Sequence, residues 1–274
     1  MSLTPVRQHG AWWLKRDDLF SLGPSGRTRG GKLRQCAALL IGSGAARVIT
    51  GASIHSPQSA IVADVARHLN IPSLVLCGGH MMTRPISIAQ ELGAEVKRCA
   101  SGRHTVLFAE ARRLCEPGDL IVPFGMRPSV PDPIFYSLCG AQVRNLPSHL
   151  NTIVLACGSG ATALSVLFGL SRERRACRLL LVNVGPDRRD WILSMLDILD
   201  SEAAAWVTRN VRIEAVPLAQ RSEFRYESGV DYELGGIPLH PLYEGKAFRW
   251  LLESEGDRID AARTLFWLVG PPLH

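Results

Sequence analysis

The sequence predicts an α/β fold in which parallel sheets are covered by helices. Short apolar runs alternate with segments of helical periodicity along most of the 274 residues. This alternation is typical of parallel sheets with helices on both faces. Because 46% of the residues are apolar, a chain of this length can bury a substantial core in one large domain or two smaller ones.

Six apolar runs have the length and composition of buried strands. They are residues 48–50, 73–77, 120–123, 152–157, 179–184 and 265–269. The segments between them have the periodicity of amphipathic helices. These are residues 56–69, 86–92, 105–115, 134–143, 163–170, 191–199 and 243–252. We expect residues 53–125 to form a smaller α/β domain, and residues 1–52 with 126–274 to form a larger one.

The composition argues against several classes of protein. No run of about 18 apolar residues is present, so no transmembrane helix is expected. The seven cysteines are scattered and form no CxxC pair, which predicts neither a metal site nor a disulfide framework. The first residues lack the apolar segment of a secretory signal, so a reducing, cytoplasmic setting fits best.

The formal net charge is +6, and several arginines are clustered in the sequence. The clusters are Arg27/Arg29/Arg34, Arg172/Arg174/Arg175/Arg178 and Arg188/Arg189. Such residues form either an ordinary solvated surface or a surface that attracts phosphates, including those of nucleic acid. The charge alone leaves both interpretations open.

Lys32 is the first candidate for chemistry. It follows Gly30 and Gly31 and precedes a segment in which Leu33 and Ala37 begin one apolar helix face. Glycines let a ligand approach the backbone, and a lysine there can bind an anion or act as an amine nucleophile. The spacing from Gly26 also matches a P-loop, but Leu33 stands where a P-loop needs Ser or Thr. The alternative is that Lys32 is a surface lysine that follows a glycine turn and has no catalytic or binding role.

A second candidate is the loop Gly158-Ser159-Gly160-Ala161-Thr162, which follows an apolar strand and opens a helix. Backbone N–H groups at a helix start and the helix dipole favour a phosphate. The hydroxyls of Ser159 and Thr162 are further donors. A capped strand-to-helix turn would produce the same pattern without a ligand.

Two further loops contain polar groups at predicted helix starts. Ser56 and Gln58 could donate hydrogen bonds to a carboxylate, although helix capping also explains Ser56. Tyr243 beside Glu244 offers a phenol that can transfer a proton and a carboxylate that can pair with a cation. An acidic residue that complements the helix dipole is the simpler alternative for Glu244.

Taken in order, five motifs resemble the fold-type-II pyridoxal-phosphate (PLP) enzymes, specifically the group of aminocyclopropane-carboxylate deaminase and D-cysteine desulfhydrase. The motifs are WLKRDDL at 13–19, GGKLR at 30–34, SPQ at 56–58, GSGAT at 158–162 and PLYEGKA at 241–247. The resemblance spans nearly the whole chain. It implies a tryptophan synthase β-like fold, with two open parallel-sheet lobes covered by helices.

The resemblance also implies roles for individual residues. Lys32 would form the Schiff base with PLP and then act as general base, and Gly158–Thr162 would bind the cofactor phosphate. Glu244 would face the pyridine nitrogen, and Tyr243 would exchange a proton near the substrate. Ser56 and Gln58 would bind the substrate carboxylate, and Ser56 is counted among the catalytic residues.

The chain departs from the family pattern at several positions. Gly31 and Pro57 stand where family members usually have asparagine, and proline has no side-chain donor for the ring hydroxyl of the cofactor. The tyrosine-rich loop is also altered, and Tyr226 is the candidate to replace a substrate-facing tyrosine. We therefore expect the cofactor to be retained and the substrate to be less certain.

Three functions follow from this resemblance. The first is a PLP-dependent lyase that deaminates an amino acid or catalyses β-elimination through an external aldimine. The second is a PLP-dependent decarboxylase or lyase of an amino-acid-modified nucleotide or DNA, motivated by the basic surface and the altered loops. The third is a non-catalytic binding protein with the same fold. A homodimer is expected because such enzymes are often dimers.

Overall fold

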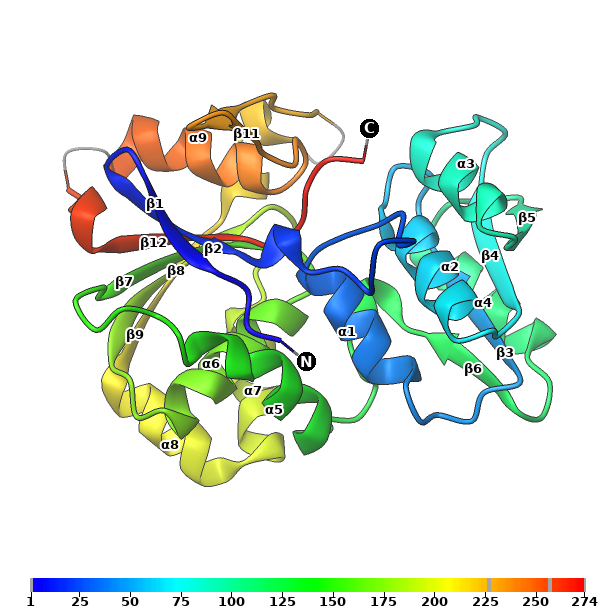
Figure 1. Ribbon diagram of the computed structural model, residues 1–274, viewed down its shortest axis with the longest axis horizontal. Coiled ribbons are helices and arrows are strands. Elements are labelled where there is room, and N and C mark those ends of the chain that lie inside the picture. The colour runs from blue at the N-terminus through cyan, green and yellow to red at the C-terminus, as the bar shows by residue number, and fades with distance from the viewer. Residues whose placement is uncertain (1, 226–227, 256–257, 274) are drawn as a thin grey trace. The chain divides into compact units, whose positions relative to one another are not determined.

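The computed structural model describes residues 2–225, 228–255 and 258–273. They form two compact units, each with its own sheet (Figure 1). Unit 1 comprises Met1–Leu19 and Val130–Pro272, and unit 2 comprises Phe20–Ser129 with Leu273–His274. The division differs from the predicted boundaries, which placed residues 20–52 in the larger domain. This stretch lies in unit 2 because its strand pairs with the sheet of that unit.

Unit 1 is built on a six-stranded sheet in the order β1-β2-β12-β7-β8-β9. Its strands are β1 (Val6–His9), β2 (Trp12–Arg16), β7 (Thr152–Cys157), β8 (Cys177–Asn183), β9 (Val211–Val216) and β12 (Thr264–Leu268). The first two strands pair antiparallel, and the pairs from β2 to β9 are parallel. A separate two-stranded ribbon joins β10 (Glu233–Leu234) to β11 (Ile237–Pro238).

Helices cover both faces of this sheet, as a parallel sheet requires (Figure 1). The helices of unit 1 are α5 (Pro133–Gly140), α6 (Ala161–Arg172), α7 (Arg189–Leu199), α8 (Ser201–Asn210) and α9 (Glu244–Glu255). On one face, Val154, Leu180 and Phe266 pack in one core with Phe248 and Leu251 of α9. The helices α5 to α8 lie on the opposite face. Every residue of β7 is buried, which explains its continuous apolar sequence.

Unit 2 has a four-stranded parallel sheet in the order β5-β4-β3-β6. Its elements are α1 (Gly31–Leu40), β3 (Arg47–Gly51), α2 (Gln58–His68), β4 (Ser73–Gly78), α3 (Arg84–Glu91), β5 (Glu95–Cys99), α4 (His104–Leu114) and β6 (Asp119–Val122). Successive strand residues point to opposite faces. Val48 therefore packs with α1 and α2, whereas Ile49 packs with Leu107 of α4.

The structure contains all six predicted strands and all the predicted helices, with ends shifted by a few residues. The strands that the sequence did not indicate include β5 and β9, which lie at sheet edges and contain charged residues. The hairpin β1–β2 and helix α8 were also not predicted. Edge strands have one side open, so they need no continuous apolar run.

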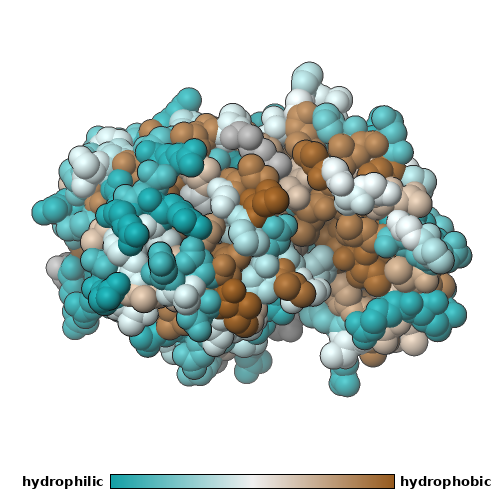
Figure 2. All heavy atoms as spheres, turned by 90° about the horizontal axis from the view of Figure 1, so that it is seen from below, coloured by the Kyte–Doolittle hydropathy of each residue, from teal (hydrophilic) through white to brown (hydrophobic). Residues whose placement is uncertain are grey.

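The surface is mixed in character. The face shown in Figure 2 combines hydrophilic areas with apolar patches. Within the described ranges, no helix has both the length and the apolarity needed to cross a bilayer. All seven cysteines are free thiols, and no cluster of metal-ligating side chains occurs among the described residues.

Candidate functional site

The glycine loop of unit 1 connects β7 to α6 at the carboxyl edge of the sheet. Gly160 has φ 89°, a left-handed conformation that favours glycine. A Cβ atom at this position would lie 2.8 Å from the ring of Trp191. Glycine is therefore required here both by the backbone angle and by the packing of α7. The loop delivers the first turn of α6, whose backbone N–H groups have no intrahelical partners and suit an anion.

Two side chains lie against the start of this loop. The Tyr243 ring packs over Gly158, since a Cβ atom on Gly158 would be 3.3 Å from Tyr243 Cε1. Arg188, in the loop after β8, donates from Nε to the Gly158 carbonyl oxygen at 3.3 Å. The structure thus brings the predicted phosphate loop and Tyr243 together. The sequence indicated Arg188 only as part of an arginine cluster. Its position beside Gly158 depends on the fold and could not be predicted from the sequence.

Glu244 is the first residue of α9, and its side chain is buried. Its Oε1 accepts a hydrogen bond from the backbone N–H of Val269, directly after β12, at 2.9 Å. Burial raises the pKa of this carboxyl group to about 7, against the opposing effect of the backbone hydrogen bonds. No lysine or arginine in the described part of the chain forms an ion pair with it. A buried carboxyl group of this kind can accommodate a cationic group of a ligand.

The loop that leads into α9 is held by buried polar groups. His240 Nδ1 accepts from the backbone N–H of Leu242 at 3.3 Å, and burial lowers the pKa of His240 to about 4. This histidine is therefore neutral near pH 7. Lys246 Nζ donates to the carbonyl oxygen of Arg225 at 2.7 Å, which fixes the chain just before position 226. The predicted substrate residue Tyr226 itself lies outside the described residues.

Lys32, the second residue of α1, belongs to unit 2. Its Nζ donates to Gln35 Oε1 and to the carbonyl oxygen of Gly125, both at 2.8 Å. The chain has three other lysines. Lys15 and Lys246 are buried with backbone acceptors, and Lys97 on β5 pairs with a glutamate of α4. Lys32 is thus the lysine at a helix start behind a glycine of positive φ, as the sequence predicted.

The other predicted residues of unit 2 lie at the start of α2. Ser56 is buried, and its Oγ accepts from the backbone N–H of Gln58 at 3.3 Å. The Gln58 amide points inward: Nε2 donates to Thr50 Oγ1 at 2.8 Å and to the Pro123 carbonyl at 3.2 Å. Its Oε1 accepts from the backbone N–H of Gly125 at 2.8 Å. Both sides of this amide therefore already have protein partners.

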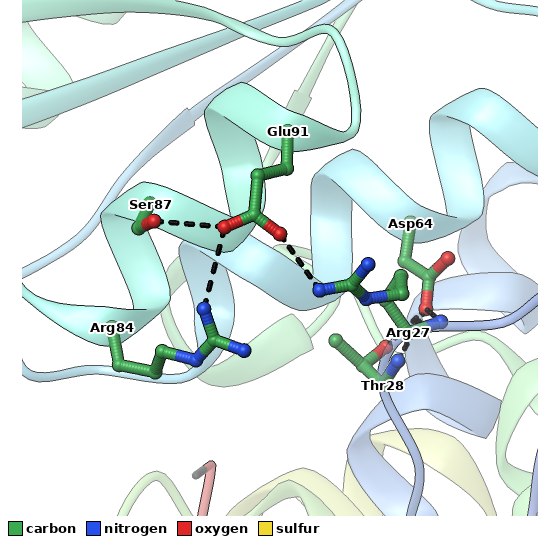
Figure 3. Close-up of polar contacts among 6 residues, drawn as sticks. All are labelled: Arg27, Thr28, Asp64, Arg84, Ser87 and Glu91. Carbon is green, nitrogen blue, oxygen red and sulfur yellow. Dashed lines mark hydrogen bonds and ion pairs between the residues drawn. The ribbon is translucent and has the colours of Figure 1, made fainter.

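The loop before Lys32 is anchored by a buried carboxylate. Asp64 of α2 accepts at Oδ2 from the backbone N–H groups of Arg27 and Thr28, at 2.9 and 2.6 Å, and from the Thr28 hydroxyl at 2.7 Å (Figure 3). The Arg27 guanidinium reaches Glu91 of α3 at 2.7 Å. Glu91 also accepts from Arg84 and Ser87. These contacts fix the chain that leads to the lysine.

The arginine clusters have largely structural partners. Arg172 pairs with an aspartate of unit 1, Arg174 stacks on Trp206, and Arg178 pairs with Glu214. Arg175 donates to the carbonyl groups of three residues between α5 and β7, namely Leu146, Pro147 and Leu150. In unit 2, Arg34 is buried against a phenylalanine ring. The clustering in the sequence is therefore weak support for a polyanion surface.

The residues of unit 1 fit the predicted cofactor. A helix start delivered by a left-handed glycine suits a phosphate monoester, and the buried Glu244 carboxyl group suits a protonated heterocyclic nitrogen. Tyr243 links the two because it contacts Gly158 and directly precedes Glu244. The roles of the individual residues toward such a group stay predictions.

Comparison with known proteins gives the same class of fold. No protein-family model matches the chain. In the solved structures, an ACC deaminase homologue aligns with a TM-score of 0.76 and 22% identity, over 98% of this chain and 90% of the other. The chain therefore has the fold of the fold-type-II PLP enzymes, and the predicted fold is confirmed.

Two curated proteins are similar in sequence over most of their length. An O-seryl-dTMP PLP-dependent decarboxylase of Salmonella phage ViI is 24% identical, over 94% of this chain and 77% of the relative. A putative 1-aminocyclopropane-1-carboxylate deaminase of Pyrococcus horikoshii is 27% identical, over 88% and 78%. These similarities confirm the resemblance inferred from the five motifs.

The first prediction concerns the glycine loop. Gly160→Ala should weaken PLP binding at least about tenfold, because the added methyl group meets Trp191 and the residue is strained at positive φ. Fluorescence titration of the cofactor-free protein measures this change. Gly42→Ala is the control, since Gly42 has φ 77° but open space around it. Equal affinity of Gly160→Ala and wild type would contradict the packing argument.

The second prediction uses the raised pKa of Glu244. Between pH 4.5 and about 7 the folded protein holds a proton that the unfolded chain releases, so this group lowers stability as pH rises. Relative to wild type, cofactor-free Glu244→Gln should therefore gain up to about 3 kcal/mol in unfolding free energy between pH 4.5 and pH 8. Urea unfolding at the two pH values measures it.

Glu91 provides the control for this comparison. Hydrogen bonding from Ser87 lowers the pKa of this exposed carboxyl group, so its contribution to stability is lost as pH falls. Glu91→Gln should therefore show no gain at high pH. An unchanged pH dependence in Glu244→Gln would show that the carboxyl group is not buried as described.

Proposed function

We propose that this protein is a PLP-dependent enzyme that acts on an amino-acid substrate as a lyase of the deaminase or β-elimination type. The proposal is based on one observation: unit 1 contains both a helix start that follows the left-handed Gly160 and the buried carboxyl group of Glu244. The comparisons support the cofactor, because both curated relatives are similar over most of the chain and one of them is a PLP-dependent decarboxylase. When bound, PLP supplies an electron sink for the bond that breaks at the substrate α-carbon.

In this proposal the residues of the chain have separate tasks. Gly158–Thr162 would bind the phosphate through the start of α6, and Glu244 would stabilise a positive charge on the heterocycle. Lys32 would hold the cofactor covalently, and its amine would take or return a proton at the substrate α-carbon. Tyr243 lies beside the phosphate loop and is the candidate for a second proton transfer.

Ser56 has a more restricted role. It is buried beside the first turn of α2, where its hydroxyl accepts from a backbone N–H. The hydroxyl proton remains available to a substrate carboxylate, which agrees with the predicted role. Gln58 is less suited to that role, because its donors already have acceptors in the protein.

Two properties of the proposal rest on the resemblance and on composition. We propose a homodimer, which sedimentation analysis of the holoenzyme would test. A reducing, cytoplasmic setting is also proposed, since all seven cysteines are free and most are buried.

A second candidate function is decarboxylation of an amino-acid group attached to a nucleotide or to DNA. It is favoured by the phage decarboxylase of O-seryl-dTMP, which is similar over 94% of this chain. In that reaction the bond between the α-carbon and the carboxylate breaks, carbon dioxide leaves, and a proton is delivered to the α-carbon. The same residues could perform it, because the reaction depends on which bond is aligned with the heterocycle.

Lys32→Ala tests whether the protein is a PLP enzyme. Wild type mixed with PLP should develop the absorption band of a lysine-bound cofactor, and the variant should lose that band and at least about a thousandfold of the activity. Lys97→Ala, which removes a surface lysine paired with Glu110, should keep both. A colourless wild type would leave the non-catalytic binding protein as the better description.

A product assay separates the two reactions. Wild-type holoenzyme is supplied with D-cysteine, aminocyclopropane carboxylate or a seryl-modified thymidine nucleotide. Ammonia with a keto acid from a free amino acid would support the first function. Carbon dioxide from the modified nucleotide alone would favour the second. Retention on DNA that falls steeply with salt would further indicate that the substrate is attached to the polymer.

A further inference from the structure

Lys32 is held by a turn of unit 2 that lies far away in the sequence. The turn is the short helical segment Phe124–Met126, which follows β6. Its Gly125 has φ 64° and ψ 24°, and the Gly125 carbonyl oxygen accepts from Lys32 Nζ at 2.8 Å. The position of the amine therefore depends on how firmly this turn is held.

Gln58 is the side chain that holds the turn. Its amide contacts the turn at two points: Oε1 accepts from the Gly125 N–H at 2.8 Å, and Nε2 donates to the Pro123 carbonyl at 3.2 Å. The second proton of Nε2 goes to Thr50 Oγ1 at 2.8 Å. Thr50 in turn donates to the Val122 carbonyl at 3.3 Å. One buried amide thus ties the end of β3 and the start of α2 to the turn after β6.

This arrangement needs an amide and no simpler group. The site requires an acceptor for Gly125 and donors for Pro123 and Thr50 at the same time. A glutamine supplies both from one planar group, whereas an ionised glutamate can only accept. Because Gln58 is only 3% exposed, water cannot easily replace a lost contact, and a buried polar group left without a partner is costly.

We propose that Gln58 is a positioning residue for the Lys32 amine, acting through the Pro123–Gly125 turn, and that it is not primarily a substrate ligand. The inference rests on the proposed function of Lys32. It predicts that replacing Gln58 lowers the rate at which Lys32 reacts with PLP, even when no substrate is present.

The test measures how fast cofactor-free protein develops the lysine-bound absorption band after mixing with PLP, without substrate. Gln58→Leu should slow this capture about tenfold, because the turn loses both of its hydrogen bonds with the amide and Thr50 of β3 loses a third. Gln58→Glu should also be slow at high pH. Relative to wild type at the same pH it should recover as pH falls, since a protonated glutamic acid regains one donor.

Gln142 provides a matched control in unit 1. It is a buried glutamine that accepts from the backbone N–H of Thr4 at 2.9 Å and donates to the Ser2 carbonyl at 3.1 Å. Gln142→Leu should lower the urea midpoint of unfolding but leave the capture rate within about twofold of wild type. This control separates a general loss of stability from a misplaced amine.

The outcomes are distinct. Capture by Gln58→Leu at the wild-type rate, or equal slowing by Gln142→Leu, would overturn the inference while the proposed function stands. If Gln58→Leu does not fold, the pH dependence of Gln58→Glu decides alone, and a rate ratio to wild type that is constant with pH would overturn it. A wild type that develops no band would overturn the proposed function and this inference with it.

Discussion

The parallel pairing of β12, β7 and β8 is the constraint on which the site of unit 1 depends. The register pairs Leu155 with Trp267 and Cys157 with Asn183, so the carboxyl ends of the three strands lie side by side. Every residue of β7 and β12 is buried. Polar chemistry can therefore occur only where the strands end, and there the chain places Gly158, Val269 and the loop that contains Arg188. The glycine loop meets the start of α9 for this reason.

Unit 2 follows the same rule with a different result. Parallel pairing of β3 with β6 sets Thr50 opposite Val122, so the loop to α2 and the turn at Phe124–Met126 begin beside each other. In unit 1 a helix start and the buried Glu244 carboxyl group lie at the strand ends. In unit 2 a network of hydrogen bonds among neutral groups lies there, around the Lys32 amine. The Lys32 amine donates to two carbonyl oxygens, those of the Gln35 side chain and of Gly125.

The parts of this structure that could be predicted from sequence are those encoded locally. Strands such as β7 are apolar along their full length, and the loop from Gly158 to Thr162 has a recognisable pattern of glycines and hydroxyls. Edge strand β5 was missed because Glu95, Lys97 and Arg98 interrupt its apolar pattern at a position where one side of the strand is open. The contact between Lys32 and Gly125 joins residues 93 positions apart. It depends on sheet order, which the local pattern does not contain.

The altered motif at residues 56–58 has a different meaning once the side chains are placed. In the sequence, the resemblance assigns Ser56 and Gln58 to the substrate carboxylate, and position 57, where proline replaces asparagine, to the ring hydroxyl of the cofactor. In the structure, Pro57 caps α2 with φ −64°, a conformation that proline adopts without strain, and Gln58 turns inward to the Gly125 turn. The amide that contacts this turn is present at position 58, whereas position 57 has no polar side chain. The hydrogen bonds from Gln58 to the Gly125 turn involve the side chain at position 58 and not the one at position 57, so they can persist when the residue at position 57 changes.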